Sequence, residues 1–171
     1  EPGLLSALQV LLDRYQKQKG IIHTNSYKVR DIVMKLGCER LMTHDAVNRG
    51  QVLEAFLSTQ EPKVLVSPSM DVGVDLKYDA ARWQAICKVP WPYLGDPIVK
   101  RRMEEDKQWY TYRTVQSLIQ ATGRICRAED DFGETYILDS DFGYLYSQSK
   151  HLFPTWWRKA LIRTSKKGVA V

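Results

Sequence analysis

The sequence contains no apolar run that approaches the roughly 20 residues needed to cross a bilayer, so we expect no membrane partner. It also lacks the basic stretch followed by an apolar stretch that marks a secretory signal, and it begins with Glu1 rather than Met. We therefore expect an intracellular protein, cytoplasmic or nucleoid-associated, and we expect this chain to be an excised or processed piece of a longer one.

Cysteine and histidine are scarce, with three residues of each kind. The cysteines are odd in number and widely spaced, which suits a reducing compartment and matches neither a zinc site nor an iron–sulfur cluster. We expect no iron–sulfur cluster in this chain and interpret all three cysteines as ordinary buried thiols. These are Cys38, Cys87 and Cys126.

Motifs that would make the chain a complete hydrolase are absent as well. There is no Gly-x-x-x-x-Gly-Lys-Ser/Thr loop to hold phosphates and Mg²⁺, and no Asp-Glu-x-His box. The Gly-x-Ser-x-Gly elbow of serine hydrolases is also missing. The chain by itself is therefore predicted neither to hydrolyse ATP nor to unwind a duplex.

What is present fits one globular domain over residues 1–171, with a core over about 4–160. Lys and Arg number 25 against 20 Asp and Glu, and this net charge of +5 permits a nucleic-acid partner without requiring one. An acidic group could suggest a Mg²⁺-dependent nuclease, but a solvated turn before a strand is the more ordinary explanation for most of it. The group is Glu129, Asp130, Asp131, Asp139 and Asp141.

Helical and strand patterns alternate along the chain. Helical spacing or caps occur over residues 4–18, from Asn25 or Ser26 onward, and over 49–58, about 97–121 and about 142–150. Strand patterns occur at 21–24, 40–43, 63–67, 83–89 and 134–138. This alternation predicts an α/β fold with a mostly parallel sheet covered on both faces, in which ligands bind at the carboxyl ends of the strands.

The most informative segment is Gln-Ala-Thr-Gly-Arg-Ile-Cys-Arg at residues 120–127. On a helix, Gln120, Arg124 and Arg127 share one face, and two guanidiniums with an amide suit a polyphosphate. Gly123 inside a helix costs about 1 kcal/mol relative to Ala, which indicates close approach of a phosphate or another backbone. An exposed polar face making surface ion pairs is the open alternative.

Two further polar segments follow predicted strands. One starts the helix after the first strand, where backbone N–H groups can bind a phosphate, although a plain helix cap is the more ordinary explanation. The other follows the strand at 63–67 and contains an Asp that could bind a ribose hydroxyl, orient an Arg or cap a helix. The candidate residues are Thr24, Asn25, Ser26, Ser69, Gly73 and Asp75.

In order, these segments resemble motifs four, five and six of a superfamily-two helicase, in particular the second motor domain of the XPD/DinG-like family. Residues 20–27 are similar to that family's strand ending in Ser-Tyr, residues 69–76 to its Gly-x-Asp loop, and residues 120–127 to its Gln-x-x-Gly-Arg-x-x-Arg signature. The resemblance covers about residues 4–160. Val72 departs from the family's usual Glu, and Asp141 from its frequent Arg.

The resemblance implies a RecA-like three-layer sandwich of the P-loop NTPase kind, acting as half of an ATP-dependent DNA helicase. The implied partners are single-stranded DNA and the first motor domain, which would hold ATP with Mg²⁺. The implied roles are arginine fingers for Arg124 and Arg127, nucleotide sensing for Gln120, nucleotide contact or coupling for Gly73, Asp75 and Gly123, and strand contact for Thr24, Asn25, Ser26 and Ser69.

The second hypothesis is a non-catalytic module of RecA-like shape that binds a nucleic acid or a partner protein. It needs the same fold but no role for the two arginines in ATP hydrolysis.

Overall fold

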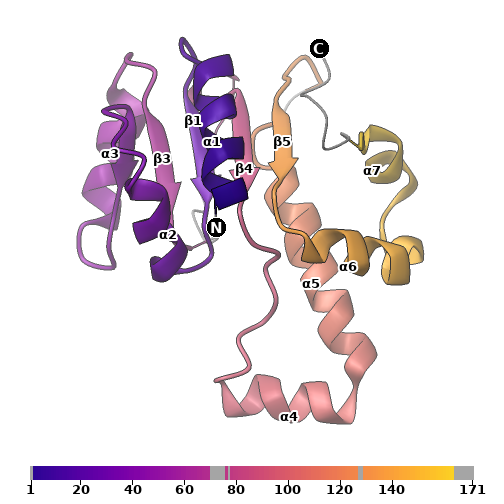
Figure 1. The fold of residues 1–171 in the computed structure, drawn as a ribbon. Coiled ribbons are helices and arrows are strands. Elements are labelled where there is room, and N and C mark those ends of the chain that lie inside the picture. The colour runs from indigo at the N-terminus through magenta and orange to yellow at the C-terminus, as the bar shows by residue number, and fades with distance from the viewer. Residues whose placement is uncertain (1, 70–75, 77, 127–128, 164–171) are drawn as a thin grey trace.

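The computed structural model describes residues 2–69, 76, 78–126 and 129–163, and all structural statements below refer to these residues. Five strands form an all-parallel sheet in the order β2-β3-β1-β4-β5 (Figure 1). In chain order they are β1 (Gly20–His23), β2 (Leu41–Thr43), β3 (Val64–Ser67), β4 (Trp83–Ile86) and β5 (Glu134–Ile137). The predicted α/β fold is therefore confirmed, and the sheet is parallel throughout.

Helices supply the crossovers that parallel neighbours require. They are α1 (Pro2–Arg14), α2 (Tyr27–Met34), α3 (Arg49–Ser58), α4 (Pro97–Glu105), α5 (Lys107–Thr122), α6 (Asp141–Ser149) and α7 (Thr155–Ala160). Two short 3₁₀ turns, η1 (Tyr78–Ala80) and η2 (Lys150–Leu152), complete the described elements.

Alternate side chains of each strand pack against different helices, which produces three layers. Ile22 of β1 lies in a cluster with apolar residues of α1 and α2, and α1 crosses in front of the sheet in Figure 1. Ile21, the residue before Ile22 in β1, points to the opposite face of the sheet and packs with Phe56 of α3. On that second face Ile86 of β4 packs against α5 and α6. This arrangement is a sheet buried on both faces.

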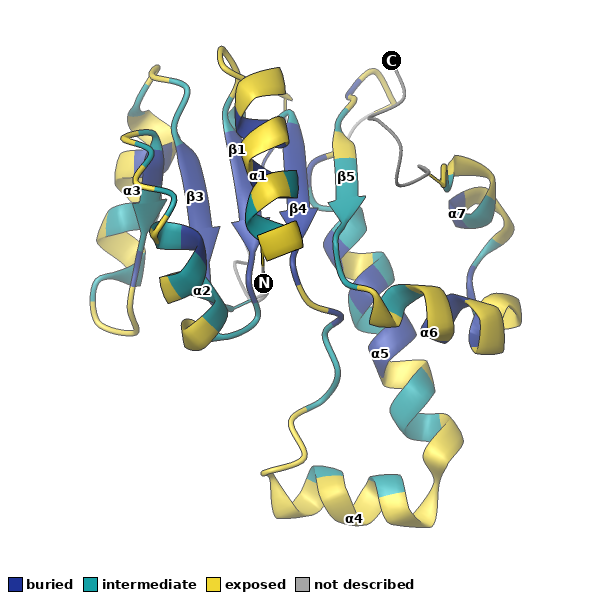
Figure 2. Cartoon of the chain, viewed as in Figure 1, coloured by how far each residue is buried: buried dark blue, intermediate teal, exposed yellow. Residues whose placement is uncertain are grey.

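The three central strands are buried along their whole length and their ends are aligned. All four residues of β1, β3 and β4 are buried, as the dark blue strands in Figure 2 show. His23, the last residue of β1, is in register with Ser67 of β3 and with Ile86 of β4. The segments that follow these three strands therefore emerge side by side at one edge.

The polar region expected over residues 97–121 forms two helices rather than one. The Asp106 carboxylate accepts hydrogen bonds from the backbone N–H groups of Gln108 and Trp109, which starts a new helix at that point. Helix α4 is exposed along most of its length and extends beyond the carboxyl ends of the strands (Figures 1 and 2). Within the described ranges, no helix has the length and apolar character needed to cross a membrane.

Candidate functional site

Thr24 ties the end of β1 to the end of β3. Its backbone N–H donates to the Ser67 carbonyl over 2.9 Å, and its hydroxyl lies 3.2 Å from the same oxygen and 3.1 Å from the Ser26 carbonyl. Thr24 is also fully buried. Its side chain therefore shapes the edge, and the half-buried Asn25 and Ser26 are the residues of this segment that reach its surface.

Asn25 and Ser26 form the turn into α2. Asn25 adopts a positive φ of 52°, a conformation that Asn tolerates better than most residues, and its Nδ2 donates to the Lys88 carbonyl over 2.7 Å. Ser26 is the N-cap of α2, and its hydroxyl accepts from the Val29 N–H at 3.5 Å. The predicted cap is present, and it leaves the first N–H groups of α2 at the strand-end edge.

Ser69 begins the polar loop after β3, and two residues fix its position. The Ser67 hydroxyl donates to the Ser69 carbonyl over 2.7 Å, and Nε2 of the buried His44 lies 3.0 Å from that hydroxyl. The remaining candidates in this loop, Gly73 and Asp75, fall outside the described residues.

Two lysines that the sequence analysis did not single out also line this edge. Lys28 and Lys88 border a depression of about 370 Å³ that is also lined by Ser26 and by two acidic residues, Asp139 and Asp141. Lys88 comes two residues after β4, so its position directly after a strand was the available signal. Amide, hydroxyl and ammonium groups of this kind suit phosphate oxygens.

The segment at residues 120–127 does not form the expected continuous helical face. Helix α5 ends at Thr122, Gly123 is its C-cap, and Arg124 lies beyond the helix while Gln120 stays exposed on it. Distant residues end the helix here: Gln84 Nε2 donates to the Ala121 carbonyl over 2.9 Å, and Trp157 Nε1 donates to Thr122 Oγ1 over 2.9 Å.

Gly123 accordingly does not sit in mid-helix. Its φ is −84°, and an added Cβ would make only ordinary contacts, the nearest being the Ile119 carbonyl at 3.7 Å. Among the described residues nothing approaches it closely, so the expected close neighbour is not found within this part of the chain. Arg127 falls outside the described residues.

Arg124 and the end of β1 are electrostatically coupled. The pKa of His23 is lowered to about 4, chiefly by burial; the hydrogen bond to Gln84 opposes the shift, and the positive charge of Arg124 adds to it. His23 immediately precedes Thr24, so the structure brings the described arginine of one predicted segment close to the start of another. Gln120, by contrast, is exposed on α5.

Two expectations about individual side chains are wrong. Cys126 is exposed and Cys38 is half-buried, so only Cys87 is a fully buried thiol. Within the acidic group before β5, Glu129 and Asp130 are exposed in a turn as expected, but the Asp131 side chain is fully buried against Arg82. Within the described ranges no group of three or more His, Cys, Asp or Glu could hold a metal ion.

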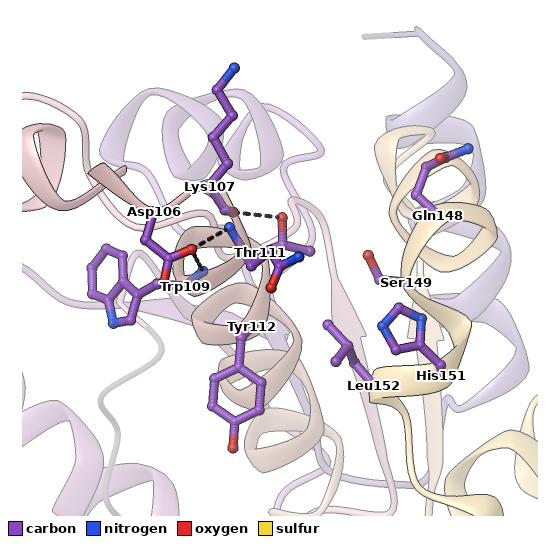
Figure 3. Close-up of a pocket in the computed structure, with 10 residues that line it drawn as sticks. Asp106, Lys107, Trp109, Thr111, Tyr112, Gln148, Ser149, His151 and Leu152 are labelled. Atoms are coloured by element: carbon purple, nitrogen blue, oxygen red, sulfur yellow. Dashed lines mark hydrogen bonds between the residues drawn. The ribbon is translucent and has the colours of Figure 1, made fainter. Parts of the chain in front are cut away.

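A larger hollow of about 640 Å³ lies elsewhere, between the first turns of α5 and the η2 turn (Figure 3). Lys107, Trp109 and Tyr112 line one side and His151 and Leu152 the other. None of the described candidate residues lines it, so the hollow belongs to a different surface from the strand-end edge.

A five-stranded parallel sheet between two helical layers, with polar segments at its carboxyl edge, defines a RecA-like α/β domain. The chain belongs to the helicase C-terminal domain family, whose model matches residues 8–160. This confirms the resemblance to the second motor domain of XPD/DinG-like superfamily-two helicases.

Relatives with curated descriptions are much longer than the matched region. The chain is 30% identical over 101 residues to the ATP-dependent DNA helicase YoaA of Escherichia coli, an alignment that covers 54% of this chain and 16% of YoaA. It is 26% identical over 115 residues to a regulator of telomere elongation helicase 1 homolog of Caenorhabditis elegans, covering 58% of this chain and 11% of that protein. The chain thus corresponds to less than a fifth of either relative.

Solved structures support the fold at lower sequence identity. An apo XPD structure matches with a TM-score of 0.67 at 18% identity, covering 86% of this chain and 33% of that one. Xpd4 of S. tokodaii matches with a TM-score of 0.63 at 17% identity, covering 86% and 31%. The C-terminal domain of Dbp5 from S. cerevisiae, solved with Gle1 and IP6, matches with a TM-score of 0.53 at 16% identity, covering 86% and 79%.

Proposed function

We propose that this chain is the second motor domain of an ATP-dependent DNA helicase and completes an ATP site held on a first motor domain. In this proposal Arg124 and Arg127 act as arginine fingers that stabilise charge on the transferring phosphoryl group. Gln120 senses the nucleotide, with Gly123 beside it, and Gly73 and Asp75 couple the nucleotide cleft to the strand track. The setting that we propose is intracellular, where DNA is the substrate.

The observation that carries the proposal is the proximity of Arg124 to the end of β1. Arg124 follows the Gly123 cap of α5, and Gln84 bonds both to the last carbonyls of α5 and to His23, the residue before Thr24. A motor needs its ATP-contacting and nucleic-acid-contacting residues on adjacent elements, because a structural change at one site must reach the other.

The strand track that we propose runs along the carboxyl edge of the sheet. Asn25 and Ser26 present an amide, a hydroxyl and the start of α2, Ser69 follows the neighbouring strand, and Lys28 and Lys88 add positive charge. Such contacts read phosphates rather than bases, so binding is independent of sequence.

ATP and Mg²⁺ are assigned chiefly to the other motor domain. Since the described part of this chain holds no metal-binding cluster and the sequence has no phosphate-binding loop, its own contribution is the guanidinium charge. We accordingly propose that the isolated chain does not turn over ATP. Measured hydrolysis by the pure chain, above that of an Arg124→Ala preparation, would contradict this.

The decisive experiment joins this chain to a first motor domain and replaces Arg124 or Arg127 by Ala. We expect DNA-stimulated ATP hydrolysis to fall by about 10³-fold or more, as for loss of an arginine finger, with an unchanged circular dichroism spectrum. Arg113→Ala is the matched control, because Arg113 is exposed on α5, the helix that ends just before Arg124, and bonds only to Gln116 among the described contacts. Normal hydrolysis in both finger variants would favour the binding-module hypothesis.

A second experiment tests the strand track on the chain alone. Anisotropy of a labelled oligothymidine should report weak binding, with log K falling by about 0.7 per phosphate contact for each unit of log salt. Lys88→Ala should make this slope shallower, whereas Lys159→Ala, at an exposed lysine of α7, should leave it unchanged. An affinity that does not respond to salt would rule out a phosphate track.

A further inference from the structure

The carboxamide of Gln84, fully buried in the middle of β4, bonds to three other elements at once. Its Nε2 donates to the Ala121 carbonyl at the end of α5 over 2.9 Å and to Thr135 Oγ1 on β5 over 2.8 Å. Its Oε1 lies 3.1 Å from His23 Nε2 at the end of β1. A flipped carboxamide would turn its oxygen toward the Ala121 carbonyl, so only this orientation satisfies all three partners.

This bond fixes the tautomer of His23. An amide oxygen only accepts, so His23 Nε2 carries the proton and donates to Gln84. The other ring nitrogen, Nδ1, is then a buried acceptor with no hydrogen-bond partner among the described residues. An unpaired buried acceptor is unfavourable, and a leucine here would not have one. The presence of a histidine at this position is therefore better explained by its hydrogen bond to Gln84 than by packing.

The hydrogen-bonded path from His23 through Gln84 to the end of α5 joins the two parts of the candidate site. On one side, His23 continues directly into Thr24 and the strand-contacting turn at Asn25 and Ser26. On the other side, the carbonyls bound by Gln84 are the last of α5, immediately before Gly123 and Arg124. The path has two side chains and no exposed member, because His23 and Gln84 are both fully buried.

We propose that His23 and Gln84 are positioning residues that couple the nucleic-acid track to the arginine-finger segment. The inference rests on the proposed function. Neither residue touches ATP or DNA. A displacement of β1 caused by a bound strand moves His23, and Gln84 transmits it to the end of α5 and so to Arg124. Hydrogen bonds hold the groups that they join at a defined distance and angle, so they couple these movements more closely than apolar packing would.

The test uses this chain joined to a first motor domain and measures the ratio of ATP hydrolysis with saturating single-stranded DNA to hydrolysis without DNA. Gln84→Leu and His23→Leu should each lower this ratio by about tenfold, within the usual range of coupling between sites. DNA-free hydrolysis and single-strand affinity should stay as in the parent protein. Gln148→Leu, an exposed amide on α6, is the matched control.

The His23→Gln variant distinguishes the contribution of the hydrogen bond from that of the imidazole ring. A glutamine carboxamide can place its N–H where His23 Nε2 lies, so this variant should keep the ratio, whereas the shorter His23→Asn should lose it. This pair decides the matter if the leucine variants do not fold. The inference is overturned if folded His23→Leu, Gln84→Leu or His23→Asn variants keep the parent ratio, or if His23→Gln loses it as His23→Leu does.

Arg124→Ala in the same assay separates this inference from the proposed function. If Arg124→Ala leaves DNA-stimulated hydrolysis intact, the finger role itself fails and the coupling proposal fails with it. If Arg124→Ala abolishes hydrolysis while the His23 and Gln84 variants behave as the parent does, the finger role stands and only the coupling role is overturned.

Discussion

The Asp131 carboxylate lies 3.0 Å from the guanidinium of Arg82, with the Asp131 side chain fully buried and the Arg82 side chain 13% exposed. The second carboxylate oxygen accepts from the Tyr78 N–H over 3.1 Å. The pair therefore fastens the segment before β5 to the segment before β4, and the guanidinium also lies 4.2 Å from the centre of the Phe132 ring.

Asp131→Ala should destabilise the fold strongly. It removes the buried carboxylate that accepts from Arg82 Nη1 and from the backbone N–H groups of Tyr78 and Phe132. Breaking a buried pair from one side costs about 3–5 kcal/mol. Urea denaturation measures the loss. Asp79→Ala is the control, because Asp79 pairs with the same Arg82 but is 93% exposed, and exposed pairs contribute about 0–1 kcal/mol. Equal effects of the two variants would contradict the buried pair.

The stability of the protein should fall as the pH falls from about 6.5 to about 4, partly because of His23. Burial lowers the pKa of His23 from its ordinary 6.5 to about 4, so in this window the unfolded chain binds a proton that the folded chain does not. The contribution of His23 to the unfolding free energy therefore rises with pH across the window, by about 3 kcal/mol, and is constant above it.

Urea unfolding at several pH values tests this assignment. His23→Gln should remove that part of the pH dependence, since glutamine does not titrate. His151→Gln should retain it, because His151 is exposed. The assignment fails if the slope between the two pH limits is the same in His23→Gln as in the parent chain.

Gly20→Ala should destabilise the start of β1 through a steric clash. An added Cβ would lie 2.2 Å from Cε2 of Trp83, and that ring is fully buried and stacked on Tyr15 at 5.3 Å between centroids, so it has no room to move. Overpacking of this kind costs about 1–3 kcal/mol. Gly50→Ala on the exposed side of α3 meets no described atom within 4 Å and should stabilise by up to about 1 kcal/mol. Thermal melting compares the two.

Cys126 should react with a thiol reagent in the native protein, and Cys87 should not. Cys126 is exposed, whereas burial raises the pKa of Cys87 to about 12 and leaves almost no thiolate at neutral pH. Labelling with a chromogenic disulfide, followed by mass spectrometry, should find Cys126 first and Cys87 only in denaturant. Cys126→Ser should remove the fast phase, and a fast phase that survives this change would contradict the assignment.

Local patterns were enough to predict most elements. Helix α3 occupies Arg49–Ser58, as its pattern indicates, and β5 begins at the expected residue. Strand β3 begins one residue later than expected. Local patterns failed where a distant partner decides. A helix pattern runs through Gly123, yet α5 ends before it, because Gln84 and Trp157 bind its last turn from 37 and 35 residues away. Similarly, Asp131 has the composition of a turn and is buried only because Arg82, 49 residues away, pairs with it.

The amino-acid sequence by itself determined the order of helices and strands, the parallel sheet and the helicase motifs, because hydrophobic period and motif spacing are properties of neighbouring residues. Tertiary structure decided where Arg124 leaves its helix and that His23 and Gln84 connect β1 to α5. Those outcomes depend on hydrogen bonds and charges between residues far apart in the chain. Such contacts exist only once the sheet has brought the strand ends together.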